Sequence, residues 1–166
     1  MAELARRIVL LGCAGCGKTT LARRLGAGIG APVIVLDDVW RAHGGNLEAF
    51  RAAMRQAHAG EAWISDGNFA LASFDIRLPR ADLLVWLDRP RWICAARAIG
   101  RVFRPGEAHE LKDLVRVLAF IRRFDRVNRP RIEAEIVRHG PHLTRLRLDD
   151  ERQARAFLSA QAPTSG

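Results

Sequence analysis

The chain alternates short apolar runs with longer segments in which apolar residues recur every three or four positions. Short runs that are apolar throughout are typical of parallel strands buried on both faces, and the periodic segments are typical of amphipathic helices. This alternation predicts an α/β fold built on a parallel sheet. The expected strands are Ile8–Leu11, Val33–Leu36, Trp63–Ser65, Leu83–Leu87 and Leu143–Leu148. The expected helices are Lys18–Leu25, Leu47–Ala59, Arg91–Val102, Leu111–Phe124, one beginning near Pro130, and Asp150–Ala160.

Two features interrupt this pattern in the C-terminal half. The segment Arg104–His109 contains Pro and Gly and lacks apolar periodicity, so we expect a surface loop between helices, a short lid near residues 103–110. Pro130 suits the first turn of a helix and would break a helix interior, so two helices should meet there at an angle. With 166 residues and no repeat or linker, we expect one domain over residues 1–166.

The first expected strand is followed by a glycine-rich loop and then by the first expected helix. Residues 12–19 match the phosphate-binding pattern G-x-x-x-x-G-K-T, whose glycines let backbone N–H groups surround phosphate oxygens at a helix N-terminus. Lys18 would reach the β- and γ-phosphates of a nucleotide, and Thr19 would offer its hydroxyl to Mg²⁺. The chain has 25 arginines and only 2 lysines, so this lysine departs from the arginine bias. The expected nucleotide-binding residues are Gly12, Cys13, Ala14, Gly15, Cys16, Gly17, Lys18, Thr19 and Thr20.

The same loop contains a second pattern, because Cys13 and Cys16 form the C-x-x-C of thiol redox sites. In the phosphate-binding interpretation both cysteines occupy variable positions where small side chains suffice. A helix N-terminus lowers the pKa of nearby thiols, so reversible oxidation that blocks nucleotide binding is a side hypothesis. A zinc site is disfavoured, because no second Cys/His pair stands at ligand spacing.

Carboxylates follow three of the expected strands, where ligands of parallel sheets gather. Asp37 could orient or deprotonate an acceptor hydroxyl, it could bind a basic partner in the sheet crevice, or it could cap a helix. Asp66 could hold Mg²⁺ through water, or it could belong to a simple turn with Gly67. Asp88 stands two residues before Pro90, and we expect it to cap the helix that starts there.

The net charge of +9 is concentrated in one quarter of the chain. Residues 89–131 hold twelve basic and four acidic residues, a net charge of +8. This concentration indicates an anionic partner, either several phosphates or a polyanion, although an arginine-rich solvated helix face would give the same composition. Arg97 and Arg101 lie on one helical face before the expected lid, and Arg123 and Arg126 lie beyond it. Two arginine clusters on either side of a lid could close over a transferring phosphoryl group and stabilise the negative charge that develops on it.

The cysteine content bears on the compartment. Three cysteines, two of them in one loop, give no framework for disulfides, so we expect a reducing, cytoplasmic setting. Arg6-Arg7 and the run Ile8–Leu11 imitate an export signal, but the apolar run is too short for one. We expect no membrane partner, because no segment of the sequence is apolar over the length of a membrane span.

These motifs together resemble the adenylate-kinase-like P-loop proteins, most closely the small bacterial group known as DNA topology modulation proteins. The marks are the phosphate-binding loop, Leu36-Asp37, Trp63–Phe69, Ala81-Asp82, Leu87–Arg91 and Arg129-Pro130, within a resemblance that extends from Ile8 to Phe157. The resemblance implies a three-layer P-loop NTPase fold with a five-stranded parallel sheet of order 2-3-1-4-5. It also implies that Asp66-Gly67 stands at the Asp-Gly of nucleotide kinases and that Arg97 and Arg101 stand at the lid. Asn68-Phe69 differs from the Phe-Pro-Arg with which adenylate kinases hold the monophosphate.

Two functions fit these observations. The first is a cytoplasmic, Mg²⁺-dependent phosphotransferase of the small-kinase type, with ATP and Mg²⁺ as cofactors and an unidentified acceptor. Its expected machinery consists of Lys18 for the phosphates, Thr19 and Asp66 for the metal, Asp37 for the acceptor, and Arg97, Arg101, Arg123 and Arg126 for the transferring group. The second is a nucleotide-dependent regulatory ATPase that binds nucleic acid through its basic C-terminal half.

Overall fold

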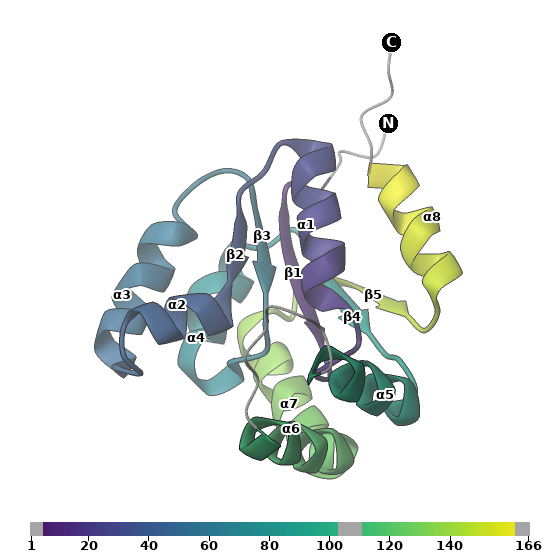
Figure 1. The fold of residues 1–166 in the computed structure, drawn as a ribbon. Helices are drawn as coiled ribbons and strands as arrows, with labels where there is room; N and C mark the ends of the chain where they lie inside the picture. Colours follow the sequence, from purple (N-terminus) through teal and green to yellow (C-terminus); the bar gives the residue numbers. More distant parts are fainter. Residues whose placement is uncertain (1–4, 103–110, 162–166) are drawn as a thin grey trace.

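The computed structural model describes residues 5–102 and 111–161, so the lid expected near residues 103–110 lies outside the described residues. Helices and strands alternate along the chain, as Figure 1 shows. The strands are β1 (Arg7–Gly12), β2 (Val33–Val35), β3 (Trp63–Asp66), β4 (Leu83–Leu87) and β5 (Thr144–Leu148). The helices are α1 (Lys18–Ile29), α2 (Leu36–Ala42), α3 (Leu47–Ala57), α4 (Ala70–Arg77), α5 (Arg91–Val102), α6 (Leu111–Arg123), α7 (Arg129–His139) and α8 (Glu151–Gln161).

The five strands form one parallel sheet in the order β2-β3-β1-β4-β5, which confirms the predicted fold class. β1 is central, and its Ile8 pairs with Ile64 of β3 and with Leu83 of β4. The central strands are buried along almost their whole length, because helices cover both faces of the sheet. Uniformly apolar strands are the sequence signature of that arrangement, and this is why the strands were predictable.

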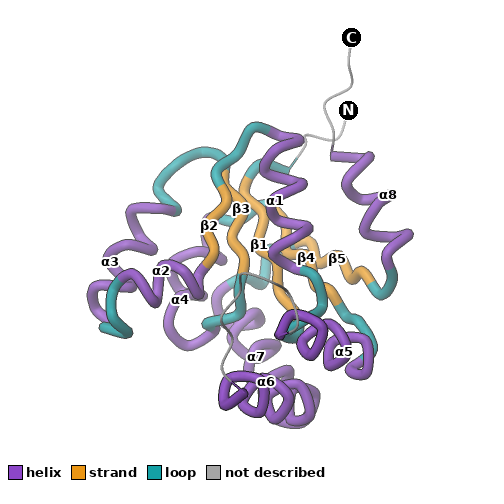
Figure 2. Tube along the Cα trace, viewed as in Figure 1, coloured by secondary structure: helices purple, strands orange, loops and turns teal. Residues whose placement is uncertain are grey.

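The helices complete a three-layer arrangement around the sheet (Figures 1 and 2). α1 packs against α8 on one face, and α4 packs against α7 on the other. α5 and α6 pack together beyond the C-terminal ends of the strands, near the loop that joins β1 to α1. Ligands of open parallel sheets bind at this edge, so the fold places a helical pair beside the expected phosphate site.

Three details of the helices differ from the expectation. Leu36, expected at the end of a strand, begins α2, and both α2 and α4 are additional helices of 7 and 8 residues. Their shortness leaves too few positions to show a helical period. A π-helical segment, Phe124–Asn128, joins α6 to α7. Pro130 lies in the first turn of α7, as predicted, and α7 leaves the end of α6 in a new direction (Figure 1).

None of the helices in the described part of the chain combines the length and the apolar character that crossing a membrane requires.

Candidate functional site

The phosphate-binding loop connects β1 to α1 at the C-terminal edge of the sheet. Its surroundings demand glycine at two positions. Gly12 has a φ of 144°, and a Cβ there would lie 2.4 Å from the carbonyl oxygen of Leu87. Gly15 has a φ of 78°, and a Cβ there would lie 2.3 Å from the carbonyl oxygen of Cys94. The loop therefore packs directly against the end of β4 and the first turn of α5, and a side chain at either glycine would displace it.

The N-terminus of α1 has the features of an anion site. Gly17 precedes the helix with a φ of 101°, and no side chain of the described residues caps the first turn. The first N–H groups of a helix have no partner within it, and the helix dipole makes that end positive. Lys18 and Thr19 begin this helix, and Thr20 is exposed in the same turn. A free helix N-terminus beside a lysine is suited to bind phosphate.

Lys18 folds back onto the loop. Its Nζ donates to the carbonyl oxygens of Gly12 at 3.0 Å and Cys13 at 2.9 Å, and it lies 3.8 Å from the Sγ of Cys16. Burial acts to lower the pKa of Lys18, but the surrounding acidic groups, among them Cys16 and Asp66, outweigh it and raise that pKa. The ammonium group is therefore held charged within the loop that it would use to bind phosphate oxygens.

Asp66 and Thr19 form a hydrogen-bonded pair next to Lys18. Asp66 ends β3 and is 3% exposed, and its Oδ2 accepts a hydrogen bond from Thr19 Oγ1 at 2.5 Å. The other carboxylate oxygen, Oδ1, is buried and finds no hydrogen-bond partner among the described residues. Burial raises the pKa of Asp66, while the Lys18 ammonium and the Thr19 hydroxyl act to lower it.

These oxygens fit a magnesium site of the kind that P-loop proteins use. A carboxylate oxygen without a partner and a hydroxyl are hard oxygen ligands, which Mg²⁺ prefers. Over residues 5–102 and 111–161, no group of three or more His, Cys, Asp or Glu side chains is arranged to hold a metal. Mg²⁺ typically keeps several waters and takes substrate phosphates as ligands, so one hydroxyl and one carboxylate are enough for it.

Asn68 is a residue of the site that sequence reasoning did not assign. Its Oδ1 accepts from the backbone N–H of Gly12 at 3.1 Å, and its Nδ2 donates to the carbonyl oxygen of Gly12 at 2.9 Å. Both backbone groups at the start of the loop are thus held by one amide. The sequence predicts a metal ligand or a turn at Asp66-Gly67 but no contact between Asn68 and the loop.

Arg77 holds the turn that carries Asn68. The side chain is fully buried, and its Nη2 donates to the carbonyl oxygens of Gly67, at 2.6 Å, and Asn68. Nη1 donates to Ser65 Oγ at 3.0 Å. Burial lowers the pKa of Arg77 to about 9, and the charge of Asp66 opposes this shift. Arg77 therefore fixes the backbone turn at Gly67, between the Asp66 carboxylate and the amide of Asn68 that holds the loop.

Asp37 lies where the sequence placed it, just after β2. It is exposed in the first turn of α2, and its charge acts to raise the pKa of both Lys18 and Asp66. No side-chain hydrogen bond caps α2 in the described residues, so the capping alternative is not what the structure shows. Its neighbour Asp38 instead pairs with Arg41 at 2.5 Å. The exposed Asp37 carboxylate is thus close enough to Lys18 and Asp66 for its charge to act on both.

Of the four arginines expected at the site, Arg97 contacts the loop. Its Nη1 donates to the carbonyl oxygen of Cys16 at 3.3 Å, and its Nη2 lies 3.8 Å from Glu151 Oε2. Arg101 follows one turn later on α5. Arg123 and Arg126 are exposed at the end of α6 and in the π-helical segment, and neither forms an ion pair or hydrogen bond with the described residues. A role for these two at the site stays a prediction.

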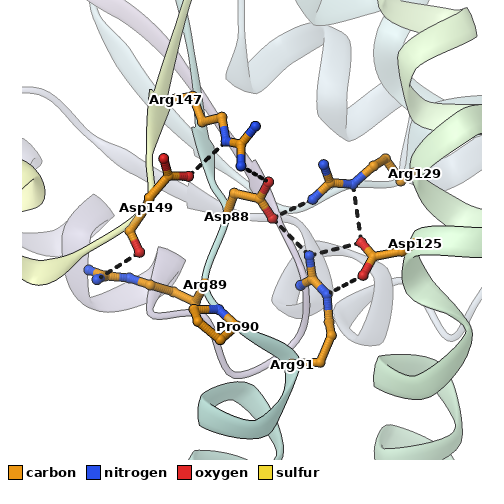
Figure 3. Close-up of a pocket in the computed structure, with 8 residues that line it drawn as sticks. All are labelled: Asp88, Arg89, Pro90, Arg91, Asp125, Arg129, Arg147 and Asp149. Atoms are coloured by element: carbon orange, nitrogen blue, oxygen red, sulfur yellow. Dashed lines mark hydrogen bonds and ion pairs between the residues drawn. The ribbon is translucent and has the colours of Figure 1, made fainter.

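The expectation that Asp88 caps α5 is wrong, because this carboxylate, itself only 7% exposed, is the centre of an ion-pair cluster (Figure 3). Asp88 Oδ1 accepts from Arg91 Nη2 at 2.8 Å and from Arg129 Nη2. Arg91 and Arg129 in turn both contact Asp125, so these four residues close a ring of alternating charge, the ion-pair ring. Arg147 of β5 adds a contact to Asp88 Oδ2 at 3.1 Å.

The ion-pair ring lies beside an open cavity of about 510 Å³ at the ends of β4 and β5. Figure 3 shows its side chains pointing toward one another across the space between the strand ends, α5 and α7. The ring also rests on aromatic side chains, because the guanidinium groups of Arg91 and Arg129 lie over the rings of Phe124 and Trp86. Its arginines are engaged with carboxylates, which identifies the ring as a structural junction of α5 with α7.

A scan against models of known protein families gives no match, and no curated protein matches the sequence. Solved structures do match. The shikimate kinase of Acinetobacter baumannii in complex with shikimate matches with a TM-score of 0.59 at 18% identity, covering 95% of this chain and 91% of that one. The shikimate kinase of Bacteroides thetaiotaomicron matches with a TM-score of 0.56 at 18% identity over 94% of this chain and 96% of that one.

A third similar structure is the YorR protein of Bacillus subtilis in complex with phosphorylated GDP. It matches with a TM-score of 0.54 at 19% identity, covering 93% of this chain and 95% of that chain. At these identities the similarity concerns the fold alone. The chain has the fold of the P-loop kinases, with the sheet order 2-3-1-4-5.

Proposed function

We propose that the protein is a Mg²⁺-ATP-dependent phosphotransferase that moves the γ-phosphoryl group of ATP to a small molecule or nucleotide. The observation that carries the proposal is the arrangement of Lys18, Thr19 and Asp66 at the open N-terminus of α1. A fold shared with P-loop kinases supports it. Membership of the DNA topology modulation group is a narrower proposal that rests on the sequence motifs.

The loop and Lys18 would bind the triphosphate. ATP supplies the phosphoryl group that is transferred, and Mg²⁺ offsets part of the negative charge of the phosphates. Lys18 now donates to the carbonyls of Gly12 and Cys13, and on binding it would exchange these neutral acceptors for charged phosphate oxygens. The free N–H groups at the start of α1 would donate to the same phosphates.

The opposite side of the site would hold the metal and the acceptor. Thr19 would offer oxygen lone pairs to Mg²⁺, and Asp66 would bind its waters through the unpartnered Oδ1. Asp37 is exposed and would accept the proton of an acceptor hydroxyl. Arg97, already on the loop, and Arg101 one turn later would stabilise negative charge that develops during transfer.

The test is ADP formation from ATP and Mg²⁺, with a panel of nucleoside monophosphates, nucleosides and small hydroxylated metabolites. Lys18→Ala should lose ATP binding and turnover, because it removes the cation that meets the phosphates. Lys112→Ala is a matched control, since Lys112 is the other lysine of the chain and is exposed on α6. Turnover that survives in Lys18→Ala would contradict the proposal, and stimulation by one panel compound would identify the acceptor.

The alternative function is a regulatory ATPase that binds nucleic acid. Within the described residues 111–131, four exposed arginines form no ion pair with the described residues, namely Arg122, Arg123, Arg126 and Arg131, and these could contact a polyanion. That function predicts slow ATP hydrolysis that no small acceptor stimulates and that duplex DNA accelerates. The same panel, extended with DNA, therefore separates the two functions.

A further inference from the structure

All three cysteines of the chain meet at the phosphate-binding loop. Cys13 and Cys16 belong to the loop, and Cys94 lies in the first turn of α5, against which the loop packs. None of the three forms a disulfide, and all are buried. Three thiols at one loop allow three disulfide pairings, and the sequence pattern alone favours Cys13 with Cys16.

The structure points to a different pair. Cys13 and Cys94 interact through their thiols, each being the largest cause of the shift in the other's pKa, and the Cys94 Sγ also donates to the carbonyl oxygen of Arg89 at 3.8 Å. The backbone beside them is in direct contact, because a Cβ on Gly15 would lie 3.2 Å from the Cα of Cys94. The Cys16 thiol points toward Lys18 and Gly12. Its Sγ lies 3.8 Å from Lys18 Nζ and would lie 2.9 Å from a Cβ added to Gly12.

We propose that Cys13 and Cys94 form an oxidation site, a thiol pair that hydrogen peroxide converts to a disulfide between the phosphate-binding loop and α5. The Cys94 thiolate attacks one peroxide oxygen, which breaks the O–O bond and gives a sulfenic acid and, after protonation, water. The Cys13 sulfur then attacks the sulfenic sulfur, forms the S–S bond and expels the hydroxyl, which leaves as a second water with the thiol proton. Two thiols lose two protons and two electrons, and one peroxide becomes two waters.

The surroundings of the two thiols suit these roles. Contact with Cys13 is the largest cause that lowers the pKa of Cys94 to about 7, and the guanidinium of Arg91 lowers it further. Contact with Cys94 and burial raise the pKa of Cys13. A thiol with a pKa near neutrality is the better peroxide nucleophile, and its neutral partner is placed to resolve the sulfenic acid.

The disulfide would oppose nucleotide binding. An S–S bond is about 2.05 Å long, shorter than any hydrogen-bonded contact between thiols, so the loop at Cys13 must move toward α5. The carbonyl of Cys13 holds Lys18, and the following residues supply the N–H groups that would surround phosphate. Conversely, both thiols have no exposed surface, so peroxide reaches them only when the loop opens, and a bound nucleotide would slow that opening.

The pairing is tested on the full chain by peroxide treatment, alkylation of remaining thiols, trypsin digestion and mass spectrometry. Trypsin would release Cys13 and Cys16 together in residues 8–18 and Cys94 in residues 92–97. We expect a cross-link between these two peptides in the wild type and in Cys16→Ala, and its loss in Cys13→Ala and in Cys94→Ala. A disulfide within residues 8–18, a cross-link that persists in Cys13→Ala, or no disulfide at all would overturn the proposal.

The effect of the disulfide on nucleotide binding is tested by measuring the affinity for ATP. This test rests on the proposed function. Oxidised wild-type protein should bind ATP about tenfold or more weakly, a typical coupling between two sites, and a reducing agent should restore binding. Cys94→Ala should show no effect of peroxide, and Mg²⁺-ATP should slow cross-linking of the wild type. Equal ATP affinity of the cross-linked and reduced proteins would refute the blocking role. If the reduced protein binds no ATP, the proposed function fails, while the peptide map still decides the thiol pair.

Discussion

At the scale of single residues, His58 is a buried histidine whose neighbours require a neutral ring. Its Nδ1 lies 2.8 Å from the carbonyl oxygen of Met54, and its Nε2 lies 3.0 Å from Ser65 Oγ. A neutral ring can donate to the carbonyl and accept from the Ser65 hydroxyl, which itself accepts from Arg77. Burial lowers the pKa of His58 to about 4, and the charges of Arg77 and Arg80 lower it as well.

We predict that this histidine makes the fold less stable in acid. The unfolded chain binds a proton on His58 with a pKa of 6.5, and the folded chain with a pKa of about 4, so acid favours unfolding. The free energy of unfolding should fall as the pH drops below the unfolded pKa of 6.5 toward the folded pKa of about 4. Between pH 7.5 and pH 5 the fall should be about 2 kcal/mol. Urea denaturation at both pH values measures this difference.

The control for this prediction is a second histidine. His58→Gln should remove most of the pH-dependent difference, whereas His142→Gln should leave it unchanged, because His142 is exposed. A difference of the same size in His58→Gln and in the wild type would show that other groups cause the acid sensitivity.

The candidate site residues that the sequence predicts are those whose position follows from a short stretch of neighbouring residues. Lys18 and Thr19 follow from the spacing of the loop, and Asp66 follows from its position at the end of an apolar run. Asn68 could not be assigned in this way, because its partner Gly12 is 56 residues away and the contact exists only where β1 lies beside β3. A side-chain amide that holds backbone leaves no pattern in the sequence.

At the scale of secondary-structure elements, the ion-pair ring determines where α5 lies. It joins the end of β4 and the start of α5 to the π-helical segment and α7, through Asp88, Arg91, Asp125 and Arg129. α5 carries Cys94 and Arg97, which both contact the phosphate-binding loop. π-helical segments are frequent at functional sites, and here the segment contributes the carboxylate that links the two helices.

We predict that Asp125→Asn destabilises the fold by about 1 kcal/mol, because it removes the charge from two hydrogen bonds with Arg91 and from the ion pair with Arg129, at a carboxylate that is about half exposed to solvent. Asp113→Asn is a matched control, since Asp113 pairs with Arg116 at 3.8 Å on an exposed face and should cost about 0.5 kcal/mol or less. The shift of the urea midpoint measures both. Equal costs would mean that the ring is no stronger than a surface ion pair.

The elements themselves were predictable where the apolar pattern is unbroken. Four of the expected strands end within one residue of the observed ends, and the fifth, β4, matches fully. Continuous apolar runs mark β1, β3 and β4, which are buried along almost their whole length, whereas β5 alternates apolar and polar residues and is mostly exposed. The role of Asp88 was not predictable, because its partners Arg129 and Arg147 come from α7 and β5. Proximity to Pro90 suggested a cap, but long-range ion pairs determine where the carboxylate points.

At the scale of the whole molecule, the positive charge is less available than the sequence indicates. Five arginines between residues 89 and 131 form ion pairs with carboxylates of the described residues. The paired ones are Arg89, Arg91, Arg97, Arg116 and Arg129. A count along the chain cannot separate cations that hold the fold together from cations that face a partner, so the composition overstated the field of this segment.

We therefore predict weak, non-specific binding to duplex DNA. On the basic segment, the exposed arginines that form no ion pair with the described residues are Arg122, Arg123, Arg126 and Arg131. These could neutralise only a few phosphates, so the affinity of this segment for duplex DNA should be micromolar or weaker at physiological salt. With about four phosphates contacted, the affinity should fall by roughly two orders of magnitude between 50 and 200 mM salt. Fluorescence anisotropy with a labelled duplex measures both, and replacing Arg123 and Arg126 by Gln should reduce the salt slope. Sub-micromolar binding at physiological salt would instead favour the regulatory ATPase, because these four arginines could not produce it without a dedicated nucleic-acid interface.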